Sequence, residues 1–237
     1  MYRINLRLAS ALAVPHVGIA DSVAREADIP VSEIAILPNG HPLQPDVGES
    51  SLGPELPARY VLFAGALAHW QGVDVMLEAI RSPAWPDGLT LVVIGDGADV
   101  DLVEAASGPR VRYLGRRSPA EVGEALRGAV CSLSPKVLTD VTSSGISPFK
   151  VLEAGTQSTA VVATRVPGQA EYVDKYACGL LIEPGDAEGL AHAVSKLHYD
   201  EELARELGRN GRAASQDFRW ENHAAELSRL VDPRQSP

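Results

Sequence analysis

The sequence predicts an α/β fold built on a doubly wound parallel sheet of about six strands. From Tyr60 onward, short apolar runs alternate with amphipathic stretches, an order typical of right-handed βαβ units. The runs are continuously apolar, as expected of parallel strands covered on both faces. The chain has 237 residues, 45 % of them hydrophobic, which suffices for a large buried core.

Each predicted strand is followed by a helical pattern or a tight turn. The strands are expected at residues 60–64, 89–94, 111–114, 129–133, 160–163 and 179–182. Helical patterns are expected at residues 73–80, 119–126 and 148–152, then from 186 to 197, with two further helices through 203–207 and 224–231. Ser118 to Glu121 forms a capping box with proline at the first helical position. Ser147-Pro148 repeats the cap-then-proline signal.

The first 58 residues have a different character. Apolar runs at 17–20 and 34–37 are the length of strands, with a short helix expected at 22–27, for which Asp21-Ser22 supplies the cap. Residues 46–58 are rich in proline, glycine and serine and are interpreted as a linker. Some forty residues cannot bury a core of their own, so this segment must pack against something else.

Composition excludes several classes of protein. The formal net charge is −10, which argues against nucleic acid or an anionic membrane as the main partner. No apolar run reaches the ~18–20 residues of a transmembrane span. Arg3 and Arg7 precede a short apolar run, which resembles a signal peptide; the alternative is a short helix that leads into a strand. Two cysteines cannot build a disulfide scaffold, so a reducing, cytoplasmic location is expected.

Two places in the chain are candidates for phosphate binding. Gly95-Asp96-Gly97 directly follows a strand, but Val100 stands where a dinucleotide fingerprint needs its third glycine, so a tight turn is favoured. The stronger candidate is the helix start at Ser147-Pro148, where the free amides of Phe149, Lys150 and Val151 would face the carboxyl edge of the sheet. Such a helix end binds pyrophosphate without a basic side chain.

Glu153 lies one turn into that helix, where its carboxylate can accept two hydrogen bonds from ribose hydroxyls. The alternative is an ordinary capped helix with a solvated glutamate. The six histidines show no metal-ligand spacing, so no metal site is expected. His69 and Trp70 follow the first strand and would line a cleft or form an exposed turn.

The order of short motifs resembles the C-terminal, donor-binding domain of GT-B glycosyltransferases of family 4 (glycosyl transferases group 1). The subgroup that it looks most like has a Ser-Pro-x-Lys-x-x-Glu helix start. The matching segments are residues 38–40, 61–65, 70–74, 93–97, 111–115, 147–154, 161–164, 168–171 and 179–186.

The resemblance implies a nucleotide-diphosphate sugar held between two Rossmann-like domains, and hexosyl transfer with retention. It would place Glu153 on the ribose, the amides after Ser147 on the diphosphate, and the turn Leu114-Gly115-Arg116 toward the base. No cofactor and no metal would be needed, because helix dipoles and basic side chains stabilise the departing diphosphate.

Three positions of the implied donor site depart from the family pattern, and two nearby lysines would compensate for them. Ala66, next to Gly65, replaces the usual arginine, and Gln71 replaces the usual lysine. Gly145 replaces the first glutamate of a paired-glutamate motif. Each lost cation removes charge-assisted hydrogen bonds worth about 1.5–3 kcal/mol. Lys136 and Lys150 lie near the same edge, where they would substitute for the lost cations or remain solvated surface charges.

The resemblance also divides the chain. Residues 1–45 would be the remnant of an N-terminal Rossmann-like domain, 46–58 the linker, 59–217 the nucleotide-sugar-binding domain and 218–237 the C-terminal crossover helix and tail. Two functions remain open. The chain is the donor-binding half of a split glycosyltransferase, or it is a degenerate, non-catalytic subunit that activates or stabilises a partner. Either function predicts a second chain or self-association over residues 1–45 and 219–231.

Overall fold

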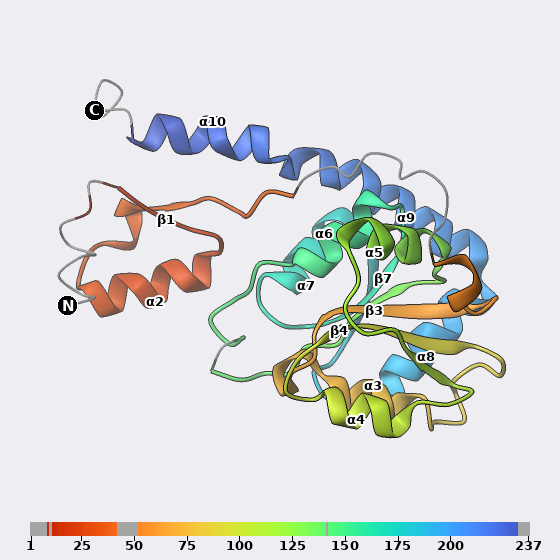
Figure 1. Ribbon diagram of the computed structural model, residues 1–237. Helices are drawn as coiled ribbons and strands as arrows, with labels where there is room; N and C mark the ends of the chain where they lie inside the picture. The colour runs from red at the N-terminus through yellow and green to blue at the C-terminus, as the bar shows by residue number, and fades with distance from the viewer. Residues whose placement is uncertain (1–8, 10, 42–51, 141, 232–237) are drawn as a thin grey trace.

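The main body of the protein is a six-stranded, fully parallel sheet, as expected. The computed structural model describes residues 9, 11–41, 52–140 and 142–231 (Figure 1). Neighbouring strands follow the order β5-β4-β3-β6-β7-β8. The strands are β3 (Tyr60–Ala66), β4 (Thr90–Asp96), β5 (Val111–Tyr113), β6 (Ser132–Ser134), β7 (Val161–Thr164) and β8 (Gly179–Ile182). The predicted α/β class is therefore confirmed.

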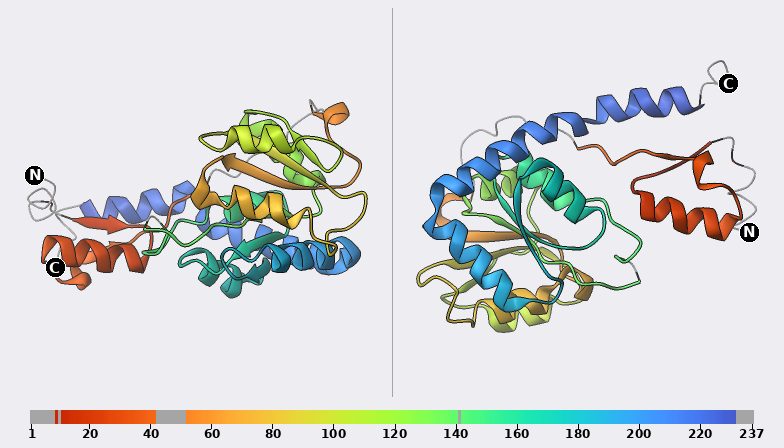
Figure 2. Two further views of the ribbon diagram at one scale, coloured as in Figure 1. Left: turned by 90° about the horizontal axis from the view of Figure 1, so that it is seen from below. Right: turned by 180° about the vertical axis from the view of Figure 1, so that it is seen from behind.

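Helices cover both faces of this sheet (Figures 1 and 2). One face is covered by α3 (Val73–Ala79), α4 (Val100–Ala106) and α8 (Ala187–Tyr199). The other is covered by α5 (Pro119–Gly128), α6 (Phe149–Thr156) and α7 (Gln169–Tyr176), with α9 (Glu201–Ser215) packed on α6. Successive residues of β3 point to opposite faces of the sheet. Phe63 packs with residues of α3, α4 and α8, and Leu62 packs with residues of α5 and α6.

The chain reverses its direction of winding beside β3. Connections run from β3 outward to β4 and β5, then return to β6 on the other side of β3 and continue to β7 and β8. The loops after β3 and β6 therefore leave in opposite directions. A crevice between such loops is where open α/β sheets place their ligands.

One of the predicted helix starts is confirmed and another is wrong. Ser118 Oγ accepts the amide of Glu121, and the Glu121 carboxylate accepts the amide of Ser118 at 2.8 Å. By contrast, Ser147 does not cap α6. Pro148 has ψ 52°, outside the helical region, so the helix begins one residue later than expected, at Phe149.

The N-terminal residues form a separate βαβ unit. It comprises β1 (Leu12–Val14), α2 (Val17–Ala27) and β2 (Ile34–Ile36), and the two strands pair in parallel. The strand expected at 17–20 is therefore wrong, because those residues begin α2. The helix buries Ala20, Ala24 and Ala27, which are spaced by four and three residues as one helical face requires.

The connection from this unit to the main body is described only in part. Residues 42–51, which include the first part of the expected linker 46–58, lie outside the described residues, as do residues 1–8, on which the signal-peptide alternative depends. Leu52 is fully buried, and a 3-10 turn follows at Gly53–Glu55. The last part of the expected linker thus belongs to the core of the main body.

The end of the N-terminal part, residues 40 and 41, contacts the segment 218–220. The His41 amide donates to the carbonyl of Phe218 at 2.6 Å, and residue 41 forms a parallel bridge with Arg219. Gly40 lies against the Trp220 ring, where a Cβ would come within 2.7 Å. From there α10 (Trp220–Val231) extends beyond the main body, toward the side on which the N-terminal unit lies (Figure 1).

Candidate functional site

A cavity of about 510 Å³ opens at the carboxyl ends of β3 and β4, within the usual ~300–1,000 Å³ of small-molecule sites. Its walls include Gly65 at the end of β3, Asp96 at the end of β4, Leu126 of α5 and Glu153 of α6. Both glycines of Gly95-Asp96-Gly97 line it too. The cavity lies at the sheet edge where the sequence predicted ligand binding.

Two lysines meet beside the cavity on a single acceptor. Gln71 Oε1 accepts a hydrogen bond from Lys136 Nζ at 2.8 Å and another from Lys150 Nζ at 2.9 Å. The three residues come from a turn after β3, the loop after β6 and the first turn of α6. They bridge the crevice where the winding of the sheet reverses.

Neither lysine is a solvated surface charge, so that alternative is wrong. Lys136 is 5 % exposed and its Nζ lies 4.5 Å from the centroid of the Trp70 ring. Lys150 is partly buried, with its Nζ 5.0 Å from the Phe63 ring centroid. A Cβ on Gly65 would lie 2.5 Å from Lys150 Nζ, so glycine at 65 makes room for the ammonium group.

Burial makes both lysines unusually acidic. Desolvation, with a contribution from nearby Lys150, lowers the pKa of Lys136 to about 7. Desolvation lowers the pKa of Lys150 to about 8, while Glu153 acts in the opposite direction. In the parts of the chain that the structure describes, neither ammonium group forms an ion pair with a carboxylate. The two lysines therefore form a locally positive site in an acidic protein, which suits an anionic ligand.

The start of α6 supplies fewer free amides than expected. The Phe149 amide donates to the Ser147 carbonyl at 2.9 Å. Among the described residues, the amides of Lys150 and Val151 have no hydrogen-bond partner. The prediction of three free amides is therefore wrong for Phe149, and two N–H groups are left for a ligand at this helix end.

Glu153 faces a histidine that sequence reasoning did not assign. His41 Nε2 lies 3.8 Å from Glu153 Oε1, and both residues line the cavity. The His41 side chain is buried, whereas that of Glu153 is 40 % exposed. The two residues are far apart in sequence, and no local pattern marks His41 as a site residue.

Gly145 cannot take the part of a ligand-binding side chain, and its surroundings explain why glycine stands there. Its φ is +104°, and a Cβ would lie 2.0 Å from His16 Nδ1. Gly18 makes a similar close approach to the carbonyl of Ser144. The first turn of α2 therefore lies directly against the loop that leads to α6.

The remaining predicted residues differ in their relation to the cavity. Ala66 and Arg116 line the cavity. Leu114 is partly buried against the α5 cluster, and the Gly115 carbonyl accepts the amide of Gly95 at 2.9 Å, so these two residues support the wall without lining it. His69, exposed and 3.9 Å from Asp74, does not line the cavity.

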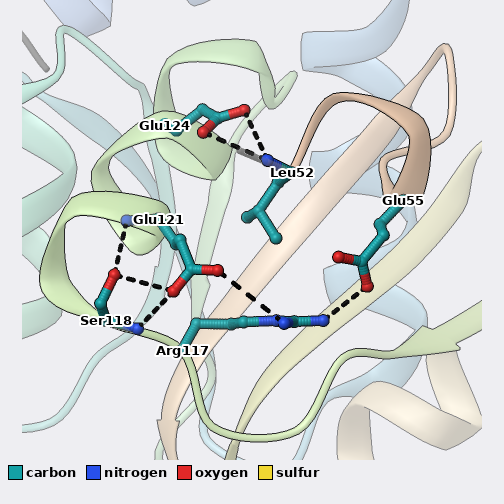
Figure 3. A network of polar contacts seen from close by, with 6 residues as sticks. All are labelled: Leu52, Glu55, Arg117, Ser118, Glu121 and Glu124. Carbon is teal, nitrogen blue, oxygen red and sulfur yellow. Dashed lines mark hydrogen bonds and ion pairs between the residues drawn. The ribbon is translucent and has the colours of Figure 1, made fainter. Parts of the chain in front are cut away.

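A network of polar contacts around Arg117, the residue after Arg116, connects three segments of the chain (Figure 3). Arg117, which lines the cavity, lies 2.5 Å from Glu55 and 3.8 Å from Glu121. Glu121 also belongs to the capping box of α5 with Ser118. The end of the linker, the loop after β5 and the start of α5 are thereby held together.

In the described ranges, no cluster of three or more histidine, cysteine, aspartate or glutamate side chains has the arrangement of a metal site. None of the helices in these ranges is long and apolar enough to cross a membrane.

A doubly wound sheet with a cavity at the carboxyl ends of its strands is typical of nucleotide-binding α/β proteins. The profile of the family described as glycosyl transferases group 1 matches residues 58–200, more than half of the chain. The chain therefore belongs to the glycosyl transferases group 1 family, and the resemblance found in the sequence is confirmed.

Curated relatives agree with this assignment. An uncharacterized glycosyltransferase of Methanocaldococcus jannaschii is 32 % identical over 164 residues, which cover 68 % of this chain and 44 % of that protein. A D-inositol 3-phosphate glycosyltransferase of Corynebacterium efficiens is 26 % identical over 213 residues, or 85 % and 49 % of the two chains. The chain thus spans about half the length, or less, of these relatives.

Solved structures share the fold. The Anabaena protein HepE, in complex with UDP and glucose, superposes with a TM-score of 0.77 at 18 % identity, covering 98 % of this chain and 67 % of that one. A sucrose-phosphate synthase from Thermosynechococcus elongatus gives a TM-score of 0.77 at 24 % identity, with coverage of 97 % and 59 %. The fold is that of GT-B glycosyltransferases.

Proposed function

We propose that this chain is the donor-binding half of a glycosyltransferase that transfers a hexosyl group from a nucleotide-diphosphate sugar with retention. The observation that carries the proposal is the convergence of Lys136 and Lys150 on one glutamine oxygen beside the cavity. Buried cations without a carboxylate partner are stabilised by an anionic ligand. The Anabaena homologue of known structure was solved with UDP and glucose, which supports a nucleotide sugar as that ligand.

The diphosphate is assigned to the lysines and to the start of α6. Lys136 and Lys150 replace the cations that the family keeps at Ala66 and Gln71, and the Lys150 and Val151 amides add hydrogen-bond donors. Because these groups supply the positive charge that a departing diphosphate needs, the reaction is proposed to require neither metal nor cofactor.

The nucleoside is assigned to the remainder of the cavity. Glu153 would accept hydrogen bonds from the ribose, and the exposed Arg116 side chain, with the turn that contains Leu114 and Gly115, would lie toward the base. Gly65 leaves the ligand close access to the backbone at the end of β3.

Calorimetric titration of the chain with UDP, GDP, ADP and dTDP tests the proposal. One of them is expected to bind, with equal affinity in magnesium and in EDTA. Glu153→Gln and Lys136→Met should each weaken binding roughly tenfold, as expected for charge-assisted hydrogen bonds. His192→Gln, on the exposed surface of α8, is the matched control. Absence of binding by all four nucleotides at millimolar concentration would refute the proposal.

A second candidate is a non-catalytic subunit that stabilises a partner. It is favoured by His16, which fills the space next to Gly145 where the family pattern has a carboxylate. The two candidates differ in one measurement. The donor half, once joined by an acceptor domain, turns over a nucleotide sugar, whereas the non-catalytic subunit raises the stability of its partner without release of nucleotide.

The N-terminal unit is proposed to contact a second chain or a second copy of this one. Its two-stranded parallel sheet packs on α2, and parallel sheets are normally covered on both faces. Ile36 is 46 % exposed, and Trp220 and Leu227 of α10 are 49 % and 47 % exposed. Light scattering is expected to show self-association, or a complex with a second chain; a strict monomer that captures no partner would contradict this.

A further inference from the structure

The imidazole of His41 is a buried polar group in the cavity wall that the proposed function leaves unused. The residue is 7 % exposed, and it lines the same cavity as Glu153. Its backbone is fixed by the hydrogen bond from its amide to the Phe218 carbonyl. The ring is therefore held in place before any ligand arrives.

The surroundings of the two ring nitrogens differ. Nδ1 is buried and has no hydrogen-bond partner among the described residues, whereas Nε2 lies 3.8 Å from Glu153 Oε1. A buried N–H without an acceptor is costlier than a bare nitrogen without a donor. The neutral ring therefore carries its proton on Nε2, on the side of Glu153.

The distance between Nε2 and Oε1 is too long for a direct hydrogen bond, but one oxygen atom can lie about 2.8 Å from both. A carboxylate only accepts hydrogen bonds, so Glu153 alone binds the proton of a hydroxyl group and leaves the hydroxyl oxygen without a donor. An Nε2–H group supplies that donor.

We propose that His41 and Glu153 hold one ribose hydroxyl of the donor nucleotide between them, with His41 Nε2–H donating to the hydroxyl oxygen and the hydroxyl donating to Glu153. This inference rests on the proposed function, and it adds a residue from the N-terminal side of the linker to the nucleoside site. His41 thereby contributes to the choice of ribonucleotides over deoxynucleotides.

Three substitutions separate the atoms of the ring. The amide of His41→Gln reaches the position of Nε2, that of His41→Asn reaches only the position of Nδ1, and His41→Phe keeps a ring without a donor. His69→Phe is the control, because His69 is exposed and does not line the cavity. Each protein is titrated calorimetrically with UDP, GDP and ADP and with the 2′-deoxy and 3′-deoxy forms of the nucleotide that binds.

His41→Phe and His41→Asn are expected to weaken binding of the ribonucleotide about five- to tenfold, and His41→Gln less than about threefold. For the deoxynucleotide that lacks the shared hydroxyl, wild type and His41→Phe should bind equally. An equal loss for the ribonucleotide and both deoxynucleotides would show a merely structural role and overturn the inference, as would equal effects of Gln and Phe.

The outcomes also separate this inference from the function on which it rests. If the wild-type chain binds a nucleotide and His41→Phe binds it equally well, the inference alone fails. If the wild-type chain binds dTDP but none of the three ribonucleotides, the inference also fails alone, and if it binds none of the four, the proposed function fails with it. Thermal unfolding midpoints of all variants, compared with wild type, establish that each is folded.

Discussion

The imidazole of His16 fills the space that a side chain at position 145 would need. A Cβ on Gly145 would lie 2.0 Å from His16 Nδ1, and that nitrogen also accepts the amide of Gly18 at 3.1 Å. One atom thus caps α2 and closes off a position in the loop before α6. The family's usual glutamate cannot be restored here by a single substitution.

Gly145→Ala is therefore expected to lower the free energy of unfolding by about 2–4 kcal/mol, since it combines overpacking with a positive φ. Urea denaturation at constant pH measures it. In the His16→Ala background the overlap is gone and only the backbone strain remains. Gly145→Ala should therefore lower the free energy of unfolding less in that background than in wild type. Equal losses in both backgrounds would contradict the contact.

The buried lysine after β6 predicts a pH dependence of stability. The pKa of Lys136 is about 7 in the folded protein and about 10.4 in an unfolded chain. Between these values the unfolded state binds more protons, so the contribution of Lys136 to the free energy of unfolding rises with pH. Lys136→Met should be more stable than wild type by about 1–3 kcal/mol at pH 7. Its free energy of unfolding should rise less steeply between pH 7 and pH 9 than that of wild type.

Urea denaturation at pH 7, 8 and 9 checks this expectation. The matched control is Lys196→Met on the exposed surface of α8, which should leave the slope unchanged. A Lys136→Met protein that is less stable than wild type at pH 7, with the same slope, would show that the charge is not penalised by burial.

Nucleotide binding should be accompanied by proton uptake. A diphosphate beside Lys136 and Lys150 raises their pKa values from about 7 and about 8, so the complex holds more protons than the free protein near pH 8. Affinity is then expected to fall as pH rises from 7 to 9. Calorimetry in phosphate and in Tris buffer measures the number of protons taken up on binding, which should be smaller for Lys136→Met than for wild type. Equal binding heats in the two buffers would refute the expected proton uptake.

Ser158, which follows α6, has a left-handed backbone with φ +58°. Left-handed backbone is unfavourable for residues with a Cβ. Ser158→Gly should therefore raise the free energy of unfolding by about 0.5–1 kcal/mol. Ser158→Ala serves as the control and should give no gain. A rise in the thermal midpoint for alanine as large as for glycine would contradict the backbone argument.

The sequence predicts the main body well because most of its strands contain a continuous apolar run and Ser118 forms its capping box locally. It fails at 17–20, where the spacing of the buried alanines in α2 matters more than the length of the apolar run. It also fails at Ser147, because Pro148 leaves the helical region. These are errors of local geometry, and they leave the topology intact.

For the site, local pattern suffices for Gly65 and Glu153, which lie at strand and helix ends. It does not suffice for Lys136, whose burial and shared acceptor depend on how the loops after β3 and β6 come together. His16 and His41 belong to the N-terminal part of the chain and reach the site only through tertiary packing. No spacing along the sequence encodes these contacts.

The pairing of His41 with residues 218 and 219 has a consequence for the cavity. The His41 amide is bonded to the Phe218 carbonyl, and its ring lies 3.8 Å from Glu153 of α6. Both side chains line the cavity. A displacement of the segment 218–219 would therefore move a side chain of the cavity wall, although that segment itself does not line the cavity.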